Sequence, residues 1–257
     1  MIYFTRKGNM MKKILLITFL CFTLAACSSD TVMPERSVED LYNEAMDFVE
    51  SESYDKAIKL FDEVERQHPY SPWAARAQIM TAYLYYKQPK YNDAVLAINR
   101  FLSLHPGNKY APYAYYLKGM CYYEQITDTN RSQMPTQEAY DTFNRLIVLY
   151  PKTEYAKDAV GKMRLTLNHI AGKEMAIGRY YLNQGKYGAA LNRFADVVRN
   201  YPNTEQIEEA LYRLTETYTI LGLDDEATRA AAVLGYNYPS SEWYKKAYNL
   251  VQKEKAK

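Results

Sequence analysis

Histidine, cysteine and tryptophan are scarce in this chain, which has three His, three Cys and two Trp among 257 residues. No two Cys or His residues have the spacing of a zinc site. A nucleophile motif and a glycine-rich phosphate loop are also missing. The sequence therefore predicts no enzyme activity, no metal site and no non-covalently bound cofactor.

Long apolar runs are absent beyond the first 26 residues. There, Met11-Lys12-Lys13 precedes an apolar stretch that ends in Leu24-Ala25-Ala26-Cys27, and Met1, Met10 and Met11 are all candidate start residues. A basic start, a short apolar core and small residues before the cleavage point are typical of an export signal. The stretch is too short for a transmembrane helix of the mature protein.

The segment Leu24-Ala25-Ala26-Cys27 resembles the lipobox of bacterial lipoproteins. The resemblance implies removal of residues 1–26, S-diacylglycerol on Cys27 and acylation of its new amine. Several acyl chains make a stable membrane anchor. Because Ser28 and not Asp follows, the sorting rule of enterobacterial lipoproteins implies the periplasmic face of the outer membrane. The alternatives are an ordinary secretory signal with a coincidental cysteine, or an uncleaved anchor.

Cleavage before Cys27 changes the charge of the protein. The chain has 32 Lys and Arg against 30 Asp and Glu, and residues 1–26 hold four basic and no acidic residues. The mature charge is thus 28 basic against 30 acidic residues, or −2, which argues against nucleic-acid binding. Cys121 would be the only other mature cysteine, so no intramolecular disulfide can form. Residues 27–37 are interpreted as the lipidated cysteine and a flexible tether.

Five proline turns reveal a repeat. A His or Tyr precedes each proline, and the prolines are 37, 45, 51 and 37 residues apart, near a 34-residue period with insertions. The positions 12, 8 and 5 residues before each proline are apolar in all five cases, with a small residue first, as in the tetratricopeptide pattern. Because His and Tyr interchange at the position before the proline, we expect His68 and His105 to pack against neighbouring side chains. The five pairs are His68-Pro69, His105-Pro106, Tyr150-Pro151, Tyr201-Pro202 and Tyr238-Pro239.

The helix before each of these segments carries a small residue, followed three positions later by an aromatic ring that fills the adjoining space. The small residues are Ala45, Ala82, Gly119, Gly178 and, as the weakest match, Thr215. The prediction is an all-α, right-handed α-solenoid of five degenerate tetratricopeptide repeats in residues 38–257. The repeats span about 38–71, 72–108, 109–153, 154–204 and 205–241, and a capping helix occupies 242–257.

Two departures from the repeat are expected. Repeat three carries a polar insertion over residues 126–135. In repeat four a helical pattern already runs through 155–173, so its first helix should be about twice the normal length. Cys121 lies beside a small position, where a buried, inert thiol is expected.

Repeat arrays bind partners along the surface lined by the first helix of each pair. In repeats one to three the positions expected there are apolar or aromatic and uncharged, and in repeats four and five they become mixed and charged. Each tyrosine alone is explained by helix packing, but the set predicts an exposed stripe for an extended apolar or aromatic peptide. A carboxylate-clamp groove is excluded, because it needs Lys and Asn at the first two positions. The predicted groove residues are Tyr42, Met46, Ile79, Tyr83, Tyr86, Tyr116, Met120 and Tyr123.

The lipobox, the tether and five repeats with these two departures resemble the BamD/ComL family, the lipoprotein subunit of the outer-membrane β-barrel assembly machine. Local matches include Arg100-Phe101-Leu102 and Asn192-Arg193. The resemblance runs from Cys27 to about Glu226. It implies that the chain binds unfolded outer-membrane proteins and docks on the periplasmic POTRA domains of BamA, beside other Bam lipoproteins.

Within this resemblance, Arg193 matches a family arginine that pairs with an acid on BamA, and Asn192 lies next to it. A solvated charge on a helix face is the alternative for Arg193. For the chain as a whole, one alternative is a periplasmic tetratricopeptide lipoprotein that organises cell-wall or division proteins. Others are an enzyme with an unrecognised site and a glycan-binding protein that stacks sugars on its tyrosines.

Overall fold

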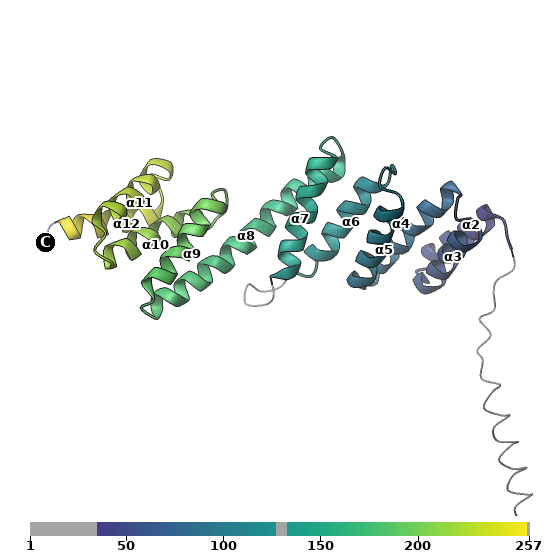
Figure 1. The fold of residues 1–257 in the computed structure, drawn as a ribbon, viewed down its shortest axis with the longest axis horizontal. Helices are drawn as coiled ribbons and strands as arrows, with labels where there is room; N and C mark the ends of the chain where they lie inside the picture. Colours follow the sequence, from purple (N-terminus) through teal and green to yellow (C-terminus); the bar gives the residue numbers. More distant parts are fainter. Residues whose placement is uncertain (1–34, 127–132, 256–257) are drawn as a thin grey trace, which may run out of the picture. The chain divides into compact units, whose positions relative to one another are not determined.

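The structure is a computed structural model that describes residues 35–126 and 133–255, and every regular element in these residues is an α-helix. Contacts group Ser37–Lys257 into one compact unit. Its helices are α2 (Val38–Glu50), α3 (Tyr54–Gln67), α4 (Pro72–Lys87), α5 (Tyr91–Leu104), α6 (Ala111–Tyr123), α7 (Met134–Leu149), α8 (Glu154–Asn183), α9 (Tyr187–Asn200), α10 (Ile207–Ile220), α11 (Asp224–Asn237) and α12 (Glu242–Lys255) (Figure 1).

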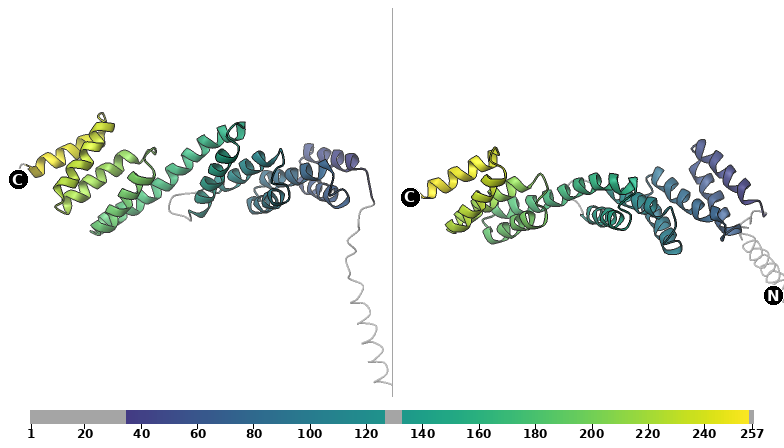
Figure 2. Two further views of the ribbon diagram at one scale, coloured as in Figure 1. Left: turned by 45° about the horizontal axis from the view of Figure 1, so that its top comes forward. Right: turned by 90° about the horizontal axis from the view of Figure 1, so that it is seen from above.

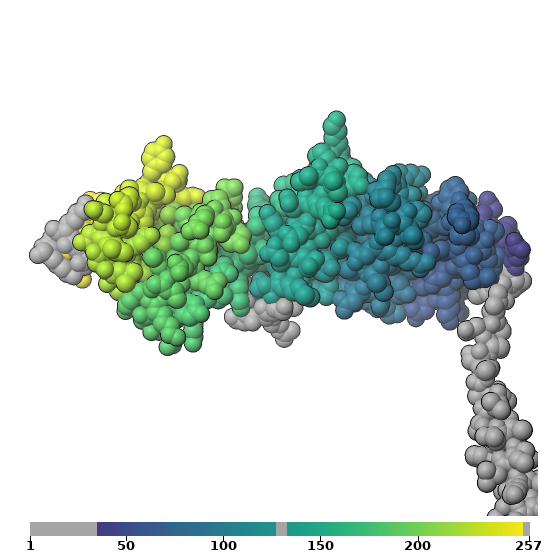
Figure 3. Space-filling model, viewed as in Figure 1, coloured from purple at the N-terminus to yellow at the C-terminus, as the bar shows by residue number. Residues whose placement is uncertain are grey.

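The helices pair in chain order. From α2 to α12, each helix packs on the next one along the chain, and further contacts join α2 to α4, α4 to α6, α6 to α8 and α10 to α12 (Figure 1). Side chains fill the spaces between successive pairs, so α2 to α7 present a continuous surface (Figure 3). The all-α tetratricopeptide solenoid predicted from the sequence is the observed fold. The predicted signal segment and Cys27 lie outside the described residues, as does most of the insertion at 126–135.

The five proline turns share one backbone conformation. The residue before each proline caps the second helix of its pair, with φ between −130° and −136° and ψ between 46° and 60°. The following proline disfavours a helical conformation at that residue. Its backbone N–H nevertheless donates to the carbonyl four residues earlier, so the capping residue still completes the last helical hydrogen bond. The ring of His105 packs on Phe101 with centroids 5.4 Å apart, which confirms the packing role predicted for this histidine.

The core follows the repeat register. All fifteen apolar positions identified from the proline turns are at most 7% exposed, and the five small positions of the first helices are buried as well. The fifteen are Ala57, Phe61, Val64, Ala94, Ile98, Phe101, Ala139, Phe143, Leu146, Ala190, Phe194, Val197, Ala227, Ala231 and Leu234.

Two glycines allow the closest helix approaches in the middle of the unit. A methyl group at Gly119 on α6 would overlap the ring of Phe143 on α7, and one at Gly178 on α8 would overlap the ring of Phe194 on α9. Where the first helix carries the larger Thr215, the position of α11 that is equivalent to Phe143 and Phe194 in the repeat holds the small Ala231. The sizes of the two positions therefore compensate.

Helix α8 has 30 residues, whereas the other described helices have 13 to 16, which confirms the predicted lengthening. Its first half packs on α6 and α7, and its second half packs on α9 (Figure 2). Thr153 caps its first turn by accepting a hydrogen bond from the Ala156 N–H. No helix in the described ranges combines the length and the apolar character that a membrane span requires.

Candidate functional site

Three of the eight predicted groove residues are buried in the core. Tyr42, Ile79 and Met120 are 3%, 5% and 9% exposed. The ring of Tyr42 lies 5.2 Å from that of Phe61 and 4.8 Å from that of Trp73, between centroids. The expectation that these three belong to an exposed stripe is therefore wrong. The physical reason for Tyr42 is that Trp73, at the start of the next first helix, covers its ring.

The other five predicted groove residues, Met46, Tyr83, Tyr86, Tyr116 and Tyr123, are half-buried on α2, α4 and α6. They keep accessible surface while their apolar bodies pack on the clusters between successive repeats. These five residues, called the tyrosine surface below, are what remains of the predicted stripe. Whether a peptide binds there stays a prediction.

Acidic residues anchor two of these tyrosines. The Tyr86 hydroxyl donates to Glu124 Oε1 at 3.4 Å, and the Tyr116 hydroxyl donates to Asp158 Oδ2 at 2.7 Å. Partial burial, followed by the charge of Glu124, raises the pKa of Tyr86 to about 12. Partial burial and the hydrogen bond to Asp158 likewise raise the pKa of Tyr116. Both phenols thus stay protonated and remain donors at neutral pH.

The long helix α8 adds residues that the repeat register does not predict. Tyr155 packs on Tyr116 and on Tyr113, with ring centroids 5.6 and 5.3 Å apart, and Lys162 lies 5.1 Å from the Tyr123 ring centroid. With Asp158 these residues border the tyrosine surface. The surface is therefore aromatic with charged edges, and the uncharged groove expected from the sequence is corrected. The residues that α8 contributes to this border lie in the additional length of that helix. They correspond to no position of the tetratricopeptide repeat, so the repeat pattern does not predict them.

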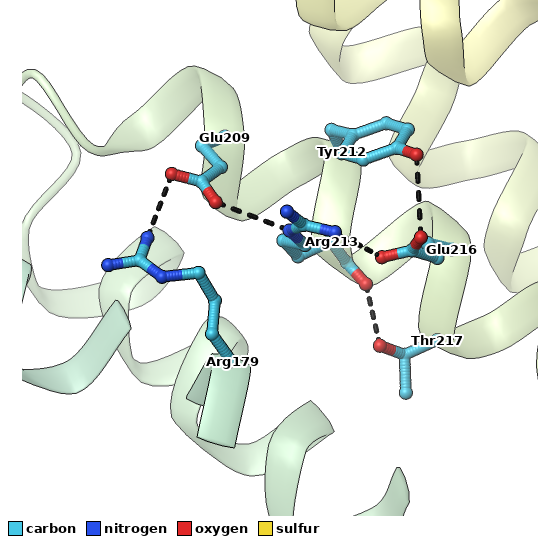
Figure 4. Close-up of polar contacts among 6 residues, drawn as sticks. All are labelled: Arg179, Glu209, Tyr212, Arg213, Glu216 and Thr217. Atoms are coloured by element: carbon cyan, nitrogen blue, oxygen red, sulfur yellow. Dashed lines mark hydrogen bonds and ion pairs between the residues drawn. The ribbon is translucent and has the colours of Figure 1, made fainter. Parts of the chain in front are cut away.

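In repeats four and five the corresponding face carries a chain of ion pairs (Figure 4). Glu209 on α10 binds Arg179 on α8 at 2.9 Å and Arg213 at 3.2 Å, and Arg213 also binds Glu216 at 2.8 Å. Tyr212 donates to Glu216 at 3.4 Å, and the Thr217 hydroxyl donates to the Arg213 carbonyl at 2.6 Å. The charged character predicted for this half is present, and its charges are largely paired with one another.

The predicted docking residues lie on α9. Asn192 is exposed, and the Arg193 side chain is 40% exposed. Arg193 Nη1 binds Glu174 Oε2 on α8 at 2.8 Å, and this hydrogen bond raises the pKa of the guanidinium. A guanidinium has five N–H donors, so this bond leaves donors for a second carboxylate.

Cys121 is fully buried, and burial raises the pKa of its thiol to about 12, as expected for an inert cysteine. Within residues 35–126 and 133–255, no group of His, Cys, Asp and Glu side chains could hold a metal ion.

Comparison with known proteins gives consistent relatives. The sequence model of the YfiO family, described as an outer membrane lipoprotein, matches residues 34–234. Outer membrane protein assembly factor BamD of Caulobacter vibrioides is 44% identical over 234 residues, which cover 89% of this chain and 77% of that protein. BamD of Rickettsia prowazekii is 44% identical over 225 residues, 88% of both chains. BamD of Neisseria meningitidis serogroup A is 34% identical over 255 residues, 93% of this chain and 96% of that protein.

Solved structures of other helical-repeat proteins are more distant. The tetratricopeptide domain of P58(IPK) has a TM-score of 0.44 and 14% identity, and the alignment covers 86% of this chain and 67% of that one. The TPR2AB domain of yeast Sti1, in its pHSP90 complex, has a TM-score of 0.43 and 11% identity, covering 84% and 83%.

Proposed function

Since this chain belongs to the YfiO family of outer membrane lipoproteins, we propose that it is an outer membrane protein assembly factor, as its relatives are named. The observation that carries this proposal is identity of 34–44% with those factors over most of the chain. The role is non-enzymatic, in keeping with a solenoid that offers surfaces for partners. Its place would be the periplasmic face of the outer membrane.

The proposed anchor is lipid on Cys27. Support comes from the Leu24-Ala25-Ala26-Cys27 motif and from the first helix of the described residues, α2, which begins at Val38, a short distance along the chain from Cys27. Metabolic labelling with palmitate in the native bacterium tests this. Label should be lost in Cys27→Ser and kept in Cys121→Ser, whose thiol is buried. Equal labelling of Cys27→Ser and the wild type would contradict the anchor.

The proposed client is an extended segment of an unfolded outer-membrane protein, bound at the tyrosine surface. Half-buried tyrosines offer rigid aromatic faces to apolar side chains, and their contacts hold them in place before a client arrives. The bordering Asp158, Glu124 and Lys162 would set the polar edge of the site. The chemistry favours aromatic or aliphatic client residues over acidic ones.

Substitution at the tyrosine surface tests client binding. Tyr83→Ala with Tyr86→Ala should weaken binding of peptides from the carboxy-terminal strands of barrel proteins about tenfold or more, as expected for loss of two aromatic anchors. The matched control is Tyr70→Ala with Tyr236→Ala, because these tyrosines are 100% and 88% exposed. Circular dichroism should show intact helices in both variants. Equal peptide affinity for the wild type and for Tyr83→Ala/Tyr86→Ala would refute this site.

The proposed docking partner is the periplasmic POTRA region of BamA, contacted through Arg193 and Asn192. Arg193→Glu should weaken co-purification of BamA from detergent-solubilised outer membranes, because like charges would then face each other. Arg199→Glu is the control: it lies on the same helix, with a side chain 73% exposed and only a 3.9 Å contact to Asp196. Equal losses in both variants would point to a general charge effect.

Depletion in the native bacterium tests the function as a whole. The abundance of outer-membrane barrel proteins should fall as the chain is depleted. Unchanged barrel levels, or a pull-down that recovers cell-wall synthases and no BamA homologue, would overturn the proposal in favour of a cell-wall or division scaffold.

A further inference from the structure

A cavity of about 570 Å³ opens between α3, α4 and α5. Gln78, Thr81 and Tyr85 of α4 line it, whereas Tyr83 and Tyr86 of the same helix belong to the tyrosine surface. At 3.6 residues per turn these two sets occupy different faces of α4. The cavity is thus separate from the surface proposed for the client, and its volume falls in the ~300–1,000 Å³ range of ligand pockets.

The floor of the cavity contains two unpartnered polar groups. Gln78 is 9% exposed and Thr81 is 7% exposed. Gln78 Oε1 and Thr81 Oγ1 have no hydrogen-bond partner among the described residues. Buried polar atoms normally have a hydrogen-bond partner, so an unpaired one needs a physical explanation. Gln78 Oε1 can only accept a hydrogen bond, so the missing partner on that atom is a donor.

The walls of the cavity carry three carboxylates, those of Asp62, Glu65 and Asp93, against the two guanidinium groups of Arg66 and Arg100, an excess of one negative charge. Asp62 on α3 and Asp93 on α5 form no hydrogen bond or ion pair in the part of the chain that the structure describes. The two arginines of the lining bind other acids directly, Arg100 to Glu65 and Arg66 to Glu63, and the charge of Arg100 also acts on Asp62. Burial, followed by the charge of Glu65, nevertheless raises the pKa of Asp62 above its usual value. Partial burial, followed by the charges of Asp62 and Asp93, raises the pKa of the Tyr85 phenol, so both carboxylates act on one point in the cavity.

Apolar surface borders these polar groups. Leu96 on α5 is 71% exposed at the cavity wall, next to Ala97, and Pro69 lies in the lining as well. A small inorganic cation would make no favourable contact with this apolar border of the cavity. The aliphatic stem of a long basic side chain, and an apolar residue beside it in sequence, would cover it.

We propose that this cavity, the acidic socket, receives an arginine or lysine side chain from an extended segment of a partner polypeptide. The cationic head lies between Asp62 and Asp93 and donates to Gln78 Oε1, while Thr81 pairs with a peptide group or a further N–H. The stem and the neighbouring apolar residue pack on Leu96 and Ala97. The socket does not depend on the tyrosine surface, so either proposal can fail without the other.

Fluorescence anisotropy of a labelled peptide tests the socket on the full-length chain in detergent. The probe is fluorescein-Gly-Ala-Leu-Arg-Ala-Gly-amide, and its partner probe replaces arginine by the neutral, nearly isosteric citrulline. The arginine peptide should bind at least tenfold more tightly than the citrulline peptide. Asp62→Asn with Asp93→Asn should remove that difference, whereas Asp224→Asn with Asp225→Asn, on exposed residues of α11, should keep it.

Gln78→Met separates a binding role from a structural one. The substitution removes the unpaired acceptor at nearly constant volume, so the melting temperature should hold or rise while affinity for the arginine peptide falls. Equal binding of the two peptides, unchanged affinity in Asp62→Asn/Asp93→Asn, or unchanged affinity in Gln78→Met would each overturn the proposal. Binding of spermidine without binding of the arginine peptide would overturn the assignment to a polypeptide.

Discussion

Gly119 and Gly178 are the residues at which a single methyl group matters most to packing. In an open helix, Gly→Ala stabilises by about 0.5–1 kcal/mol. At these positions the added methyl would meet the rings of Phe143 and Phe194, and overpacking a core costs about 1–3 kcal/mol. The cost of the clash exceeds the gain from Gly→Ala, because each ring is fully buried and cannot move away from the added methyl group.

We therefore expect Gly119→Ala and Gly178→Ala to lower the free energy of unfolding by about 1–2 kcal/mol. Gly161→Ala is the matched control, since it lies within α8 with nothing inside 4 Å of an added methyl. That variant should gain about 0.5–1 kcal/mol. Urea unfolding followed by circular dichroism measures all three. Stabilisation by all three variants would show that the helix pairs can separate without cost.

Cys121 supplies a prediction about reactivity. Only the thiolate attacks disulfide reagents, and burial raises the pKa of this thiol to about 12. Against a pKa of about 8.5 for a free cysteine, the thiolate fraction at pH 8 falls by about a thousandfold. In a Cys21→Ser/Cys27→Ser variant, 5,5′-dithiobis(2-nitrobenzoate) should thus react with the native protein about a thousandfold more slowly than in 6 M guanidinium. The native rate should increase with pH between pH 7 and pH 9, and free-thiol kinetics at pH 8 would contradict the buried position.

Among the elements, α8 and α10 are joined by the carboxylate of Glu209, which binds both Arg179 and Arg213 (Figure 4). Glu209→Gln leaves two arginines facing a neutral amide. The Arg179 side chain is 38% exposed, so water and salt screen part of the loss, and we expect a cost of about 1 kcal/mol. The cost should shrink at 1 M salt, where the Debye length is about 3 Å.

Thermal unfolding at low and high salt measures this cost. Glu242→Gln is the control, because it removes an exposed ion pair with Lys245 inside α12 and should leave the melting temperature unchanged. A double-mutant cycle with Arg179→Ala isolates the contact between the helices. A coupling of zero would mean that apolar packing alone holds α8 and α10 together.

The helices themselves were predictable because the repeat restates one pattern five times. Proline fixes where each second helix ends, and three apolar positions at fixed offsets fix the face that it buries. The long α8 was predictable because a helical pattern continues through residues 155–173. Each of these features depends on the order of residues along one helix pair.

The candidate site was predictable only in part, because it depends on how successive pairs meet. The offset from the small position correctly places Tyr83 and Tyr86 on a half-open face of α4. The same offset puts Tyr42 on α2, where Trp73 covers it. Asp158 and Lys162 approach from the extra length of α8, which has no counterpart in the repeat. The acidic socket had no sequence signal, since Asp62 and Asp93 lie on different helices and Gln78 occupies no marked position.

In the unit as a whole, the hydrophobic core is a series of clusters, two of which meet at α8. The cluster around Phe143 ends on α8 at Ala159 and Met163, and the cluster around Phe194 begins on α8 at Ala171. Between them, Leu165 is 44% exposed. Among the described helices, α8 is the element that packs on both α7 and α9. The tyrosine surface and the ion-paired half are therefore connected by the packing of a single helix.

Linear repeat arrays unfold cooperatively only where each unit is coupled to the next. Leu165→Pro removes a backbone hydrogen bond in the middle of α8 and costs about 3 kcal/mol locally, without touching either cluster. We expect the variant to unfold in two separate steps, one for each half. Leu165→Ala keeps the helix and should leave a common transition.

The two tryptophans report on the halves separately. Trp73 packs on Tyr42 in the first half, and Trp243 packs on Tyr212 in the second, with ring centroids 4.8 and 5.2 Å apart. Variants Trp243→Phe and Trp73→Phe therefore leave one fluorescent probe in each half. In the Leu165→Pro background the two probes should give different urea midpoints, whereas in the Leu165→Ala background they should agree. Equal midpoints in Leu165→Pro would mean that contacts other than α8 couple the half with the tyrosine surface to the ion-paired half.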